Sequence, residues 1–268
     1  MRDELSVGGH AVFSAYFEGG QTNWPGTGTH PGTQGFRSNR IQGNASGVAV
    51  ADEPETVYMV TSGTHYNSGC CFDYGNTEVS GCGAPNTRRP CDDAYYASSA
   101  AAKVAANPKC PGCGQMEAIS WSTMHNGPEH NRTSKSANHP GTGVGPWIMG
   151  DLESGVWAGN DPLLNPSNIP LNTSLFVSAF LKGNSGNHWS IKAGDAQVGS
   201  LKTLYDGPRP PGYEVMKKQG AIILGVGGDD SSFGIGTFYE GAMTHNYTSD
   251  ATDDAVQRNI VALGYGQQ

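Results

Sequence analysis

The sequence has few charged residues and no long apolar run. Only 15% of its 268 residues are charged and 36% are hydrophobic. No stretch approaches the roughly 18 consecutive apolar residues of a membrane span, and the opening MRDELSVGGH lacks the apolar segment of a secretory signal. We therefore expect neither a membrane span nor a targeting segment in the chain as given.

Basic residues are also scarce. Sixteen Lys and Arg oppose 24 Asp and Glu, which gives a formal net charge of −8. A negative chain is repelled by phosphate backbones and anionic lipid headgroups, so nucleic acid and membrane surfaces are not expected partners. The sequence has no phosphate-binding loop and no convincing Ser or Cys nucleophile constellation, and its eight histidines lack metal-ligand spacing. We expect no cofactor and no metal.

Glycine and proline, in contrast, are abundant and argue against long helices. The 39 Gly and 16 Pro interrupt the chain too often for a helical bundle. Short apolar runs recur between Gly, Pro and Asn clusters at a spacing typical of a β-sandwich, and the length suits one large all-β domain. We predict a single sandwich domain over residues 1–268. Its predicted strands are at 11–17, 47–51, 56–61, 116–121, 146–152, 174–181, 188–193, 221–226 and 236–243.

Two segments break the strand pattern and predict short helices. Residues 92–107, DDAYYASSAAAKVAAN, are rich in alanine and begin with acids. Residues 252–263 have apolar side chains at i, i+4 and i+7, with Gly264 to end the helix, and we expect this helix to pack on the sandwich. Residues 18–46, rich in Gly, Thr, Asn and Pro, predict a long loop. The apolar positions of the second helix are Val256, Ile260 and Leu263.

Six cysteines and four glycosylation acceptor sequences indicate an oxidising, extracytoplasmic setting. An even number of cysteines can pair completely, and Asn-X-Ser/Thr sequences are acceptors in secreted proteins. We therefore expect a secreted glycoprotein with disulfide bonds. The acceptor asparagines are Asn44, Asn131, Asn172 and Asn246.

Cys70 and Cys71 are neighbours, which leaves two interpretations open. Adjacent Cα atoms lie about 3.8 Å apart, closer than in ordinary disulfides, so a bond between them closes a strained, rigid ring with an apolar sulfur face. Alternatively, each of them pairs with a cysteine elsewhere in the chain.

The other four cysteines bracket the first predicted helix, in an insert over residues 80–115. Cys110-Pro-Gly-Cys113 resembles one knuckle of a zinc ribbon, but the remaining two are too far apart in sequence to form the second knuckle. We favour two disulfides over a zinc site. The four residues are Cys82, Cys91, Cys110 and Cys113.

Acidic residues share a strand face with an aromatic ring near the middle of the chain. Because side chains alternate along a strand, Trp147, Met149, Asp151 and Glu153 are expected on one face. Two carboxylates beside an aromatic platform suit a sugar-binding cleft, in which the ring stacks on the sugar and the acids bind hydroxyls or carry out catalysis. The alternative is a solvent-exposed strand end.

A second acidic pair follows a glycine-rich turn. Residues 220–231, GAIILGVGGDDS, combine a buried strand with glycines that let the backbone approach a ligand, and the turn exposes Asp229 and Asp230. Taken alone, the pattern fits a calcium loop or a plain turn equally well.

Together these segments resemble the catalytic domain of the family 54 glycoside hydrolases, the fungal-type α-L-arabinofuranosidases B. The match is ordered, covers most of residues 46–265 and includes the uncommon Cys-Cys pair. The matching strings are Gly63-Thr-His-Tyr-Asn67, Cys70-Cys-Phe-Asp-Tyr-Gly-Asn76, Met116-Glu-Ala-Ile119, Gly145-Pro-Trp-Ile-Met149 with Asp151 and Glu153, Gly220-Ala-Ile-Ile-Leu-Gly225 through Asp229, Gly236-Thr-Phe-Tyr-Glu-Gly241, Met243-Thr, Val256-Gln and Asn259-Ile-Val261.

The resemblance implies a concanavalin-like β-sandwich, or jelly roll, and a retaining, exo-acting enzyme. Such an enzyme removes terminal arabinofuranose from plant-type or algal polysaccharides. The resemblance also implies that Glu153 is the nucleophile and Asp229 the acid/base. It places Asp151 in the substrate site, where it binds a sugar hydroxyl, and Cys70 with Cys71, as a vicinal disulfide against which the sugar packs. The strand face adds Trp147 and the glycine-rich turn adds Gly228 to the expected substrate site.

From the resemblance, we expect the chain as given to lack the family's long amino-terminal portion, which contributes strands, and its carboxy-terminal arabinose-binding module. Trp121 is the candidate to replace an active-site tryptophan of the family. The exposed sheet edge is expected to be covered by residues 1–45 folding back, by a partner chain or by further copies of this chain. We favour a partner or self-assembly, because residues 18–46 have few apolar side chains. The rival function is a non-catalytic carbohydrate-binding or self-assembling structural protein on the same scaffold.

Overall fold

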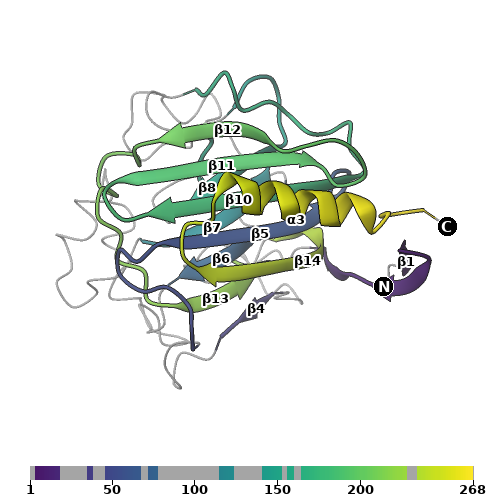
Figure 1. Ribbon diagram of the computed structural model, residues 1–268, viewed down its shortest axis with the longest axis horizontal. Helices are drawn as coiled ribbons and strands as arrows, with labels where there is room; N and C mark the ends of the chain where they lie inside the picture. The colour runs from purple at the N-terminus through teal and green to yellow at the C-terminus, as the bar shows by residue number, and fades with distance from the viewer. Residues whose placement is uncertain are drawn as a thin grey trace, which may run out of the picture.

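Two six-stranded antiparallel sheets pack face to face in this protein (Figure 1). The computed structural model describes residues 4–18, 35–38, 46–67, 72–77, 115–123, 141–152, 156–159, 164–227 and 234–267. The predicted all-β sandwich is confirmed. Sheet 1 has the order β12-β11-β10-β5-β14-β3, sheet 2 has the order β4-β13-β6-β7-β8-β9, and β1 and β2 form a separate hairpin.

The strand bounds follow the chain order. The strands are β1 Glu4–Val7, β2 His10–Phe13, β3 Ala15–Glu18, β4 Phe36–Arg37, β5 Glu55–Ser62, β6 Asp73–Thr77, β7 Glu117–Ser122, β8 Trp147–Asp151, β9 Val156–Trp157, β10 Phe176–Asn184, β11 His188–Asp195, β12 Lys202–Gly207, β13 Ala221–Leu224 and β14 Ile235–His245. The helix is α3, Asp250–Ala262.

The main hydrophobic core fills the space between the two sheets. Val57 of β5 and Ile119 of β7 are among its fully buried members. At one point the sheets approach closely, because Gly150 of β8 faces the indole ring of Trp189 from β11. A Cβ atom at Gly150 would lie 2.6 Å from that ring, so any larger residue would push the sheets apart.

Most of the predicted strands are present. The segments predicted at 56–61, 116–121, 146–152, 174–181, 188–193, 221–226 and 236–243 correspond to β5, β7, β8, β10, β11, β13 and β14. The segment at 11–17 instead forms two strands, β2 and β3, with Ser14 between them. The predicted strand at 47–51 is wrong. This segment holds only an isolated bridge between Ala51 and Lys218, because Ala51 has a φ of 52°, which is incompatible with an extended strand.

The pattern of apolar residues did not reveal five of the strands. β6 has the sequence DYGNT, in which Asp, Gly and Asn disfavour strands, yet all five residues are buried between β13 and β7. The edge strand β12 is largely polar, β1 and β9 are short, and β4 lies inside the predicted loop of residues 18–46. In β6, burial within the sheet therefore outweighed the low intrinsic preference of these residues for a strand.

Two described strands before residue 46 pair with the sheets. β3 pairs with β14 at the edge of sheet 1, and β4 pairs with β13 at the edge of sheet 2. Phe17 of β3 is only 3% exposed and belongs to the main core. The structure thus supports the first of the three ways to cover the sheet edges. Phe17, the core residue, lies just before the loop of residues 18–46 that has few apolar side chains.

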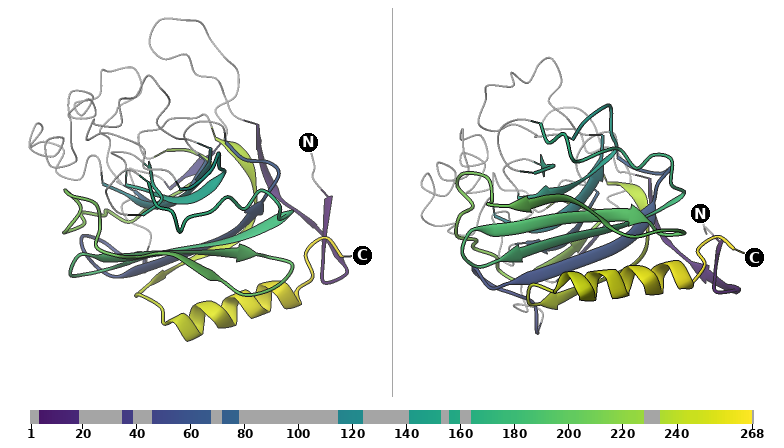
Figure 2. Two further views of the ribbon diagram at one scale, coloured as in Figure 1. Left: turned by 90° about the horizontal axis from the view of Figure 1, so that it is seen from above. Right: turned by 45° about the horizontal axis from the view of Figure 1, so that its top comes forward.

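Helix α3 packs on the outer face of sheet 1 (Figure 2), as the sequence predicted. Ser249 caps its first turn by accepting a hydrogen bond from the Thr252 amide, and Gly264, with a φ of 65°, follows its end. The predicted apolar positions are confirmed in part: Ile260 is fully buried, and Val256 is partly buried against the same cluster. Asp253 and Gln257 are buried on the helix as well.

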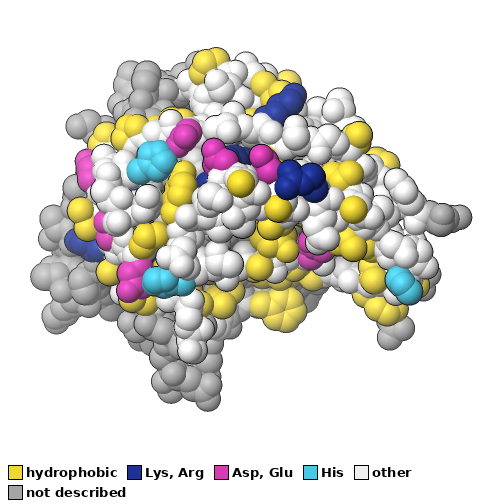
Figure 3. Space-filling model, in the orientation of Figure 1, with side chains coloured by type: hydrophobic (Ala, Val, Ile, Leu, Met, Phe, Trp, Pro, Cys, Tyr) yellow, Lys and Arg dark blue, Asp and Glu magenta, His cyan; other side chains and the backbone are white. Residues whose placement is uncertain are grey.

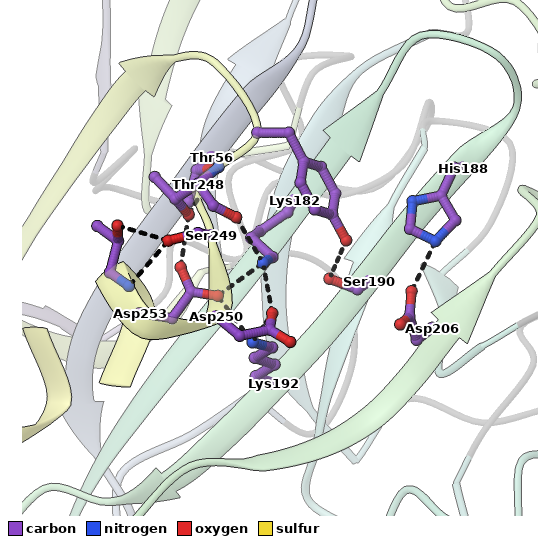
Figure 4. Close-up of polar contacts among 12 residues, drawn as sticks. Thr56, Lys182, His188, Ser190, Lys192, Asp206, Thr248, Ser249, Asp250 and Asp253 are labelled. Atoms are coloured by element: carbon purple, nitrogen blue, oxygen red, sulfur yellow. Dashed lines mark hydrogen bonds and ion pairs between the residues drawn. The ribbon is translucent and has the colours of Figure 1, made fainter. Parts of the chain in front are cut away.

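Polar contacts explain why Asp253 and Gln257 are buried on this helix. Gln257 accepts a hydrogen bond from Ser178 of β10, and Asp253 lies against Lys182 of β10 and Lys192 of β11 (Figure 4). Acidic, basic and histidine side chains lie interspersed over this face of the molecule, without a large area of one charge sign (Figure 3).

Several predictions fall outside the described residues. They are the helix at 92–107, nearly all of the insert at 80–115, and the cysteines of that insert. In the described part of the chain, no helix has the length and apolar character needed to cross a membrane.

Candidate active site

The two faces of β8 have different surroundings. Ile148 and Leu152 point into the main core between the sheets. Trp147 and Met149 form a separate cluster on the opposite, outer face of sheet 2. Alternation places Asp151, which is 5% exposed, on that outer face as well, as the sequence predicted. Glu153 lies outside the described residues.

The neighbouring strands extend this outer face with polar side chains. On β7, Ser120 and Ser122 alternate with the core residues Ile119 and Trp121. On β6, Asp73 lies between Phe72 and Tyr74, both of which belong to the core. We call this surface the site face, defined by Asp73, Ser120, Ser122, Trp147, Met149 and Asp151.

The site face is polar yet buried. Asp73, Ser120 and Ser122 are completely buried. Burial of carboxylates and hydroxyls on the outer face of a sheet is costly unless they find polar partners. It lies on the side of the sandwich away from α3 (Figure 2).

The register of sheet 2 shows how the predicted site segments approach this face. Gly225, just after β13, donates a backbone hydrogen bond of 2.8 Å to the carbonyl of Asp73. The end of β13, which leads towards Asp229, therefore lies beside the start of β6, which follows Cys71. Asp151 lies on β8, which runs antiparallel to β7, and it pairs with Ala118 of β7. Cys70, Cys71, Gly228 and Asp229 themselves are outside the described residues.

The two tryptophans considered for the sugar platform lie in different places. Trp121 is fully buried in the core between the sheets, where its Nε1 donates to the carbonyl of Ser62 at 2.9 Å. It therefore does not replace a tryptophan on the site face. Trp147 is on the site face but only 1% exposed, and its Nε1 donates to the carbonyl of Thr142 at 2.7 Å.

The segment before Cys70 is held by a compact turn after β5. The Ser62 hydroxyl accepts hydrogen bonds from the amides of Thr64 and His65. His65 Nδ1 lies 2.8 Å from Thr237 Oγ1 of β14, and Asn67 bridges to Ser122 of the site face. This turn explains the motif Gly63-Thr-His-Tyr-Asn67: it joins sheet 1 to the site face immediately before the Cys-Cys pair.

A second buried acidic cluster lies at one end of the space between the sheets. Burial raises the pKa of Glu55 to about 8, a shift that Lys218 opposes and Glu117 reinforces. Lys218 Nζ lies 3.0 Å from Glu117 Oε2 and 3.7 Å from Glu55 Oε2, and Asn76 donates to both oxygens of Glu55. Perturbed carboxyls often mark active sites. Here both carboxyls are about 1% exposed and bonded to interior groups, so we assign the cluster to the core.

The glycosylation acceptors divide between the described and remaining residues. Asn172 and Asn246 are exposed, whereas Asn44 and Asn131 lie outside the described residues. Within the described ranges, no cluster of three or more His, Cys, Asp or Glu side chains is arranged to hold a metal ion.

The model of the family "Alpha-L-arabinofuranosidase B, catalytic" matches residues 5–106 and 100–266. This chain belongs to that family. The match begins well before residue 46, so it extends the resemblance seen in the sequence into the amino-terminal strands.

Individual members of the family are similar over most of the chain. The chain is 43% identical over 237 residues to "Arabinofuranosidase/B-xylosidase" of Trichoderma koningii and 43% identical over 238 residues to "Alpha-L-arabinofuranosidase B" of Emericella nidulans. Each alignment covers 88% of this chain but 38% of the relative. The chain thus spans well under half the length of the curated relatives that it matches.

Solved structures of the family share the fold. An arabinofuranosidase complexed with arabinofuranosyl-α-1,2-xylobiose has a TM-score of 0.73 and 35% sequence identity, covering 99% of this chain and 44% of that one. A GH54 α-L-arabinofuranosidase soaked with a cyclic sulfate inhibitor has a TM-score of 0.71 and 37% identity, covering 98% and 43%.

Proposed function

We propose that this chain is an α-L-arabinofuranosidase domain that acts on the site face of sheet 2. The observation that carries the proposal is the family match over nearly the whole chain, combined with a buried polar face at which Asp151 lies. Similar proteins have been crystallised with arabinofuranosides, which supports a terminal arabinofuranose as the ligand. The polysaccharide is expected to be of plant or algal type.

The proposed reaction retains the configuration of the sugar. In it, the Glu153 carboxylate attacks the anomeric carbon while the bond to the leaving oxygen breaks, and the Asp229 carboxyl gives its proton to that oxygen. Water, deprotonated by Asp229, then releases arabinose from Glu153. A pair of this kind has its carboxyl groups about 5 to 5.5 Å apart.

The other predicted site residues have supporting roles in this proposal. Asp151, held at the end of β8, binds a sugar hydroxyl, and Gly228 lets the backbone approach the sugar. Cys70 and Cys71 form a vicinal disulfide on which the sugar packs. Trp147 supports Met149 from within the site face, because its ring is buried and its Nε1 is bonded to Thr142. The disulfides and the acceptor asparagines fit an extracellular glycoprotein.

The direct test is hydrolysis of 4-nitrophenyl α-L-arabinofuranoside by the purified chain. We expect arabinose and nitrophenol to be released. Glu153→Gln should lower kcat by several orders of magnitude, because no covalent intermediate can form. Glu214→Gln is the control and should retain activity, because Glu214 lies in the segment between β12 and β13, outside the site segments. A wild-type protein that binds arabinose without turnover would support the non-catalytic alternative.

A further inference from the structure

The segment between β14 and α3 carries one of the glycosylation acceptor sequences, Asn246-Tyr247-Thr248. Asn246 is exposed, so a glycan attached to its side chain would project into solvent. Only Ser or Thr qualifies at the second position after the asparagine, which means that the transferase recognises the hydroxyl there as well as the asparagine. In this acceptor sequence the hydroxyl is that of Thr248.

The Thr248 hydroxyl is held by the folded protein (Figure 4). It donates a hydrogen bond to Oδ1 of Asp253 in the first turn of α3, and it lies 3.1 Å from Thr56 Oγ1 of β5. Both partners are buried, since Asp253 is 1% exposed and Thr56 is 5% exposed. An enzyme that recognises this hydroxyl must therefore compete with contacts to the helix and to sheet 1.

The backbone of the acceptor sequence is fixed as well. The Thr248 amide donates to Thr56 Oγ1 at 3.0 Å, and the Thr248 carbonyl accepts from Lys182 Nζ at 2.9 Å. The Asn246 amide donates to the carbonyl of Pro54 at 3.0 Å, and the Asn246 carbonyl accepts from the Thr56 hydroxyl at 2.9 Å. The φ of Asn246 is 137°, a value that few residues other than glycine adopt. The acceptor sequence cannot change its conformation without breaking these bonds.

The acceptor sequence at Asn172 is held by fewer contacts. Asn172 and Thr173 are exposed, and the Ser174 amide donates to the carbonyl of Leu171 at 3.2 Å. Ser174 is 7% exposed, but its hydroxyl makes no hydrogen bond within the part of the chain that the structure describes. The same chain therefore provides a comparison in which the recognised hydroxyl is not bound by the fold.

We propose that Asn246 accepts a glycan only before α3 docks on sheet 1. In this proposal the transferase recognises the Thr248 hydroxyl first, and Asp253 becomes its hydrogen-bond partner when the helix docks. A glycan added early is compatible with the fold, because the Asn246 side chain stays exposed. The inference goes beyond the proposed glycosidase activity and rests on the extracellular setting proposed with it.

The transfer uses a lipid-linked oligosaccharide diphosphate as its donor. Nδ2 of Asn246 forms a bond to the anomeric carbon of the first sugar, and the bond from that carbon to the diphosphate oxygen breaks. The diphosphate leaves with the electron pair, and the amide gives one proton to a base of the transferase. The contribution of this chain is access to Asn246 and Thr248.

The test uses the full chain produced without glycans, a purified oligosaccharyltransferase and a lipid-linked oligosaccharide. A peptide of residues 240–254 presents the same acceptor sequence without sheet 1 and gives the reference rate. Mass spectrometry measures the glycan at Asn246. We expect the folded chain to be modified about a hundredfold more slowly than the peptide, because transfer then depends on the small population in which α3 is undocked. Equal rates would overturn the inference, and so would a peptide that accepts no glycan.

Two substitutions outside the acceptor sequence release Thr248. Asp253→Ala removes the group that accepts its hydroxyl proton. Thr56→Val keeps the branched shape of the side chain and removes the oxygen that bonds the Thr248 amide. Each folded variant should be modified at Asn246 several times faster than the folded wild type, because the undocked state is then more populated.

The matched control is Asp254→Ala, at the exposed position beside Asp253. It should leave the rate at Asn246 unchanged, and the rate at Asn172 should be the same in all four proteins. Folded contact variants that are modified no faster than wild type would overturn the inference, as would Asp254→Ala with an equal gain. If neither contact variant folds, the comparison of the folded wild type with the peptide decides. A chain that follows the expected pattern but does not hydrolyse the nitrophenyl arabinoside contradicts the proposed function alone.

Discussion

Lys182 of β10 and Asp253 of α3 form a buried ion pair, with Nζ 2.6 Å from Oδ2 (Figure 4). Lys182 is 0% exposed and Asp253 is 1% exposed. Lys192 of β11 approaches the same carboxylate oxygen at 2.8 Å, and the Thr248 hydroxyl bonds the other oxygen. Asp250, also in the first turn of the helix, pairs with both lysines as well. Two carboxylates therefore balance two lysines and fix the first turn of the helix to sheet 1.

Loss of this carboxylate should destabilise the protein markedly. Asp253→Asn leaves the buried Lys182 without its closest counter-charge, and breaking a buried pair in this way costs about 3 to 5 kcal/mol. Asp254→Asn, at the exposed neighbouring position, should change the free energy of unfolding by less than about 0.5 kcal/mol. Urea denaturation followed by circular dichroism measures both. Equal effects of the two substitutions would contradict the role assigned to Asp253.

Glu55 should make stability depend on pH. Its pKa is raised to about 8 in the folded protein, chiefly by burial, from an ordinary value of 4.5. A raised acid pKa means that the folded state binds the proton more tightly, so this contribution is fully present below about pH 4.5 and is lost as pH rises through 8. Relative to wild type, Glu55→Gln should therefore be more stable at alkaline pH than at acidic pH.

Glu53 provides a control for which the pH dependence of stability should have the opposite sign. A hydrogen bond from the Val50 amide is the main cause that lowers the pKa of this exposed carboxyl. Its contribution is present above the ordinary pKa and is lost on acidification, so Glu53→Gln should show a weak trend of the opposite sign. Both predictions are tested by measuring the denaturant midpoints of the two variants at acidic and at alkaline pH. The assignment fails if Glu55→Gln follows the wild-type pH dependence.

Cys70 and Cys71 should be bonded to each other. Peptide mapping without reduction should recover them in one peptide, two mass units lighter than the reduced form. Cys82, Cys91, Cys110 and Cys113 should then pair among themselves, as two disulfides rather than a zinc site. A peptide that links Cys70 or Cys71 to the insert, or zinc in the purified protein, would contradict this pairing.

The proposed mechanism fixes the stereochemistry of the product. Two successive inversions at the anomeric carbon should release arabinose first as the α-anomer, before it equilibrates in water. Proton NMR early in the hydrolysis of the nitrophenyl arabinoside distinguishes the two anomers. Initial release of the β-anomer would show a single displacement and would exclude Glu153 as a covalent nucleophile.

The folded-back strands β3 and β4 should let the chain remain a monomer. They pair at one edge of each sheet and bring Phe17 into the core, so a partner is not needed to complete those edges. Light scattering should give a mass near 28.1 kDa before glycan mass. A dimer or larger assembly that persists on dilution would instead support the partner or self-assembly that the sequence favoured.

The sequence by itself determined the class of fold and the family. Alternating apolar residues between Gly and Pro clusters predicted most strands of the two sheets, because half-buried strands impose a period of two on the chain. The same period placed Trp147, Met149 and Asp151 on one face. The Cys-Cys pair and the ordered motifs, whose chemistry is local in sequence, were sufficient to point to the arabinofuranosidase family.

Only the tertiary structure decided which faces meet. β6 reads as a poor strand, yet pairing on both sides buries every residue of it, including Asp73. The face that α3 buries includes the polar Asp253 besides the apolar Ile260, because Lys182 of β10 and Lys192 of β11 lie beneath it. Trp121 and Trp147 look equally suitable as platforms in sequence, but strand alternation within the assembled sandwich sends one into the core and the other to the site face. These outcomes depend on contacts between residues far apart in the chain, which local patterns do not encode.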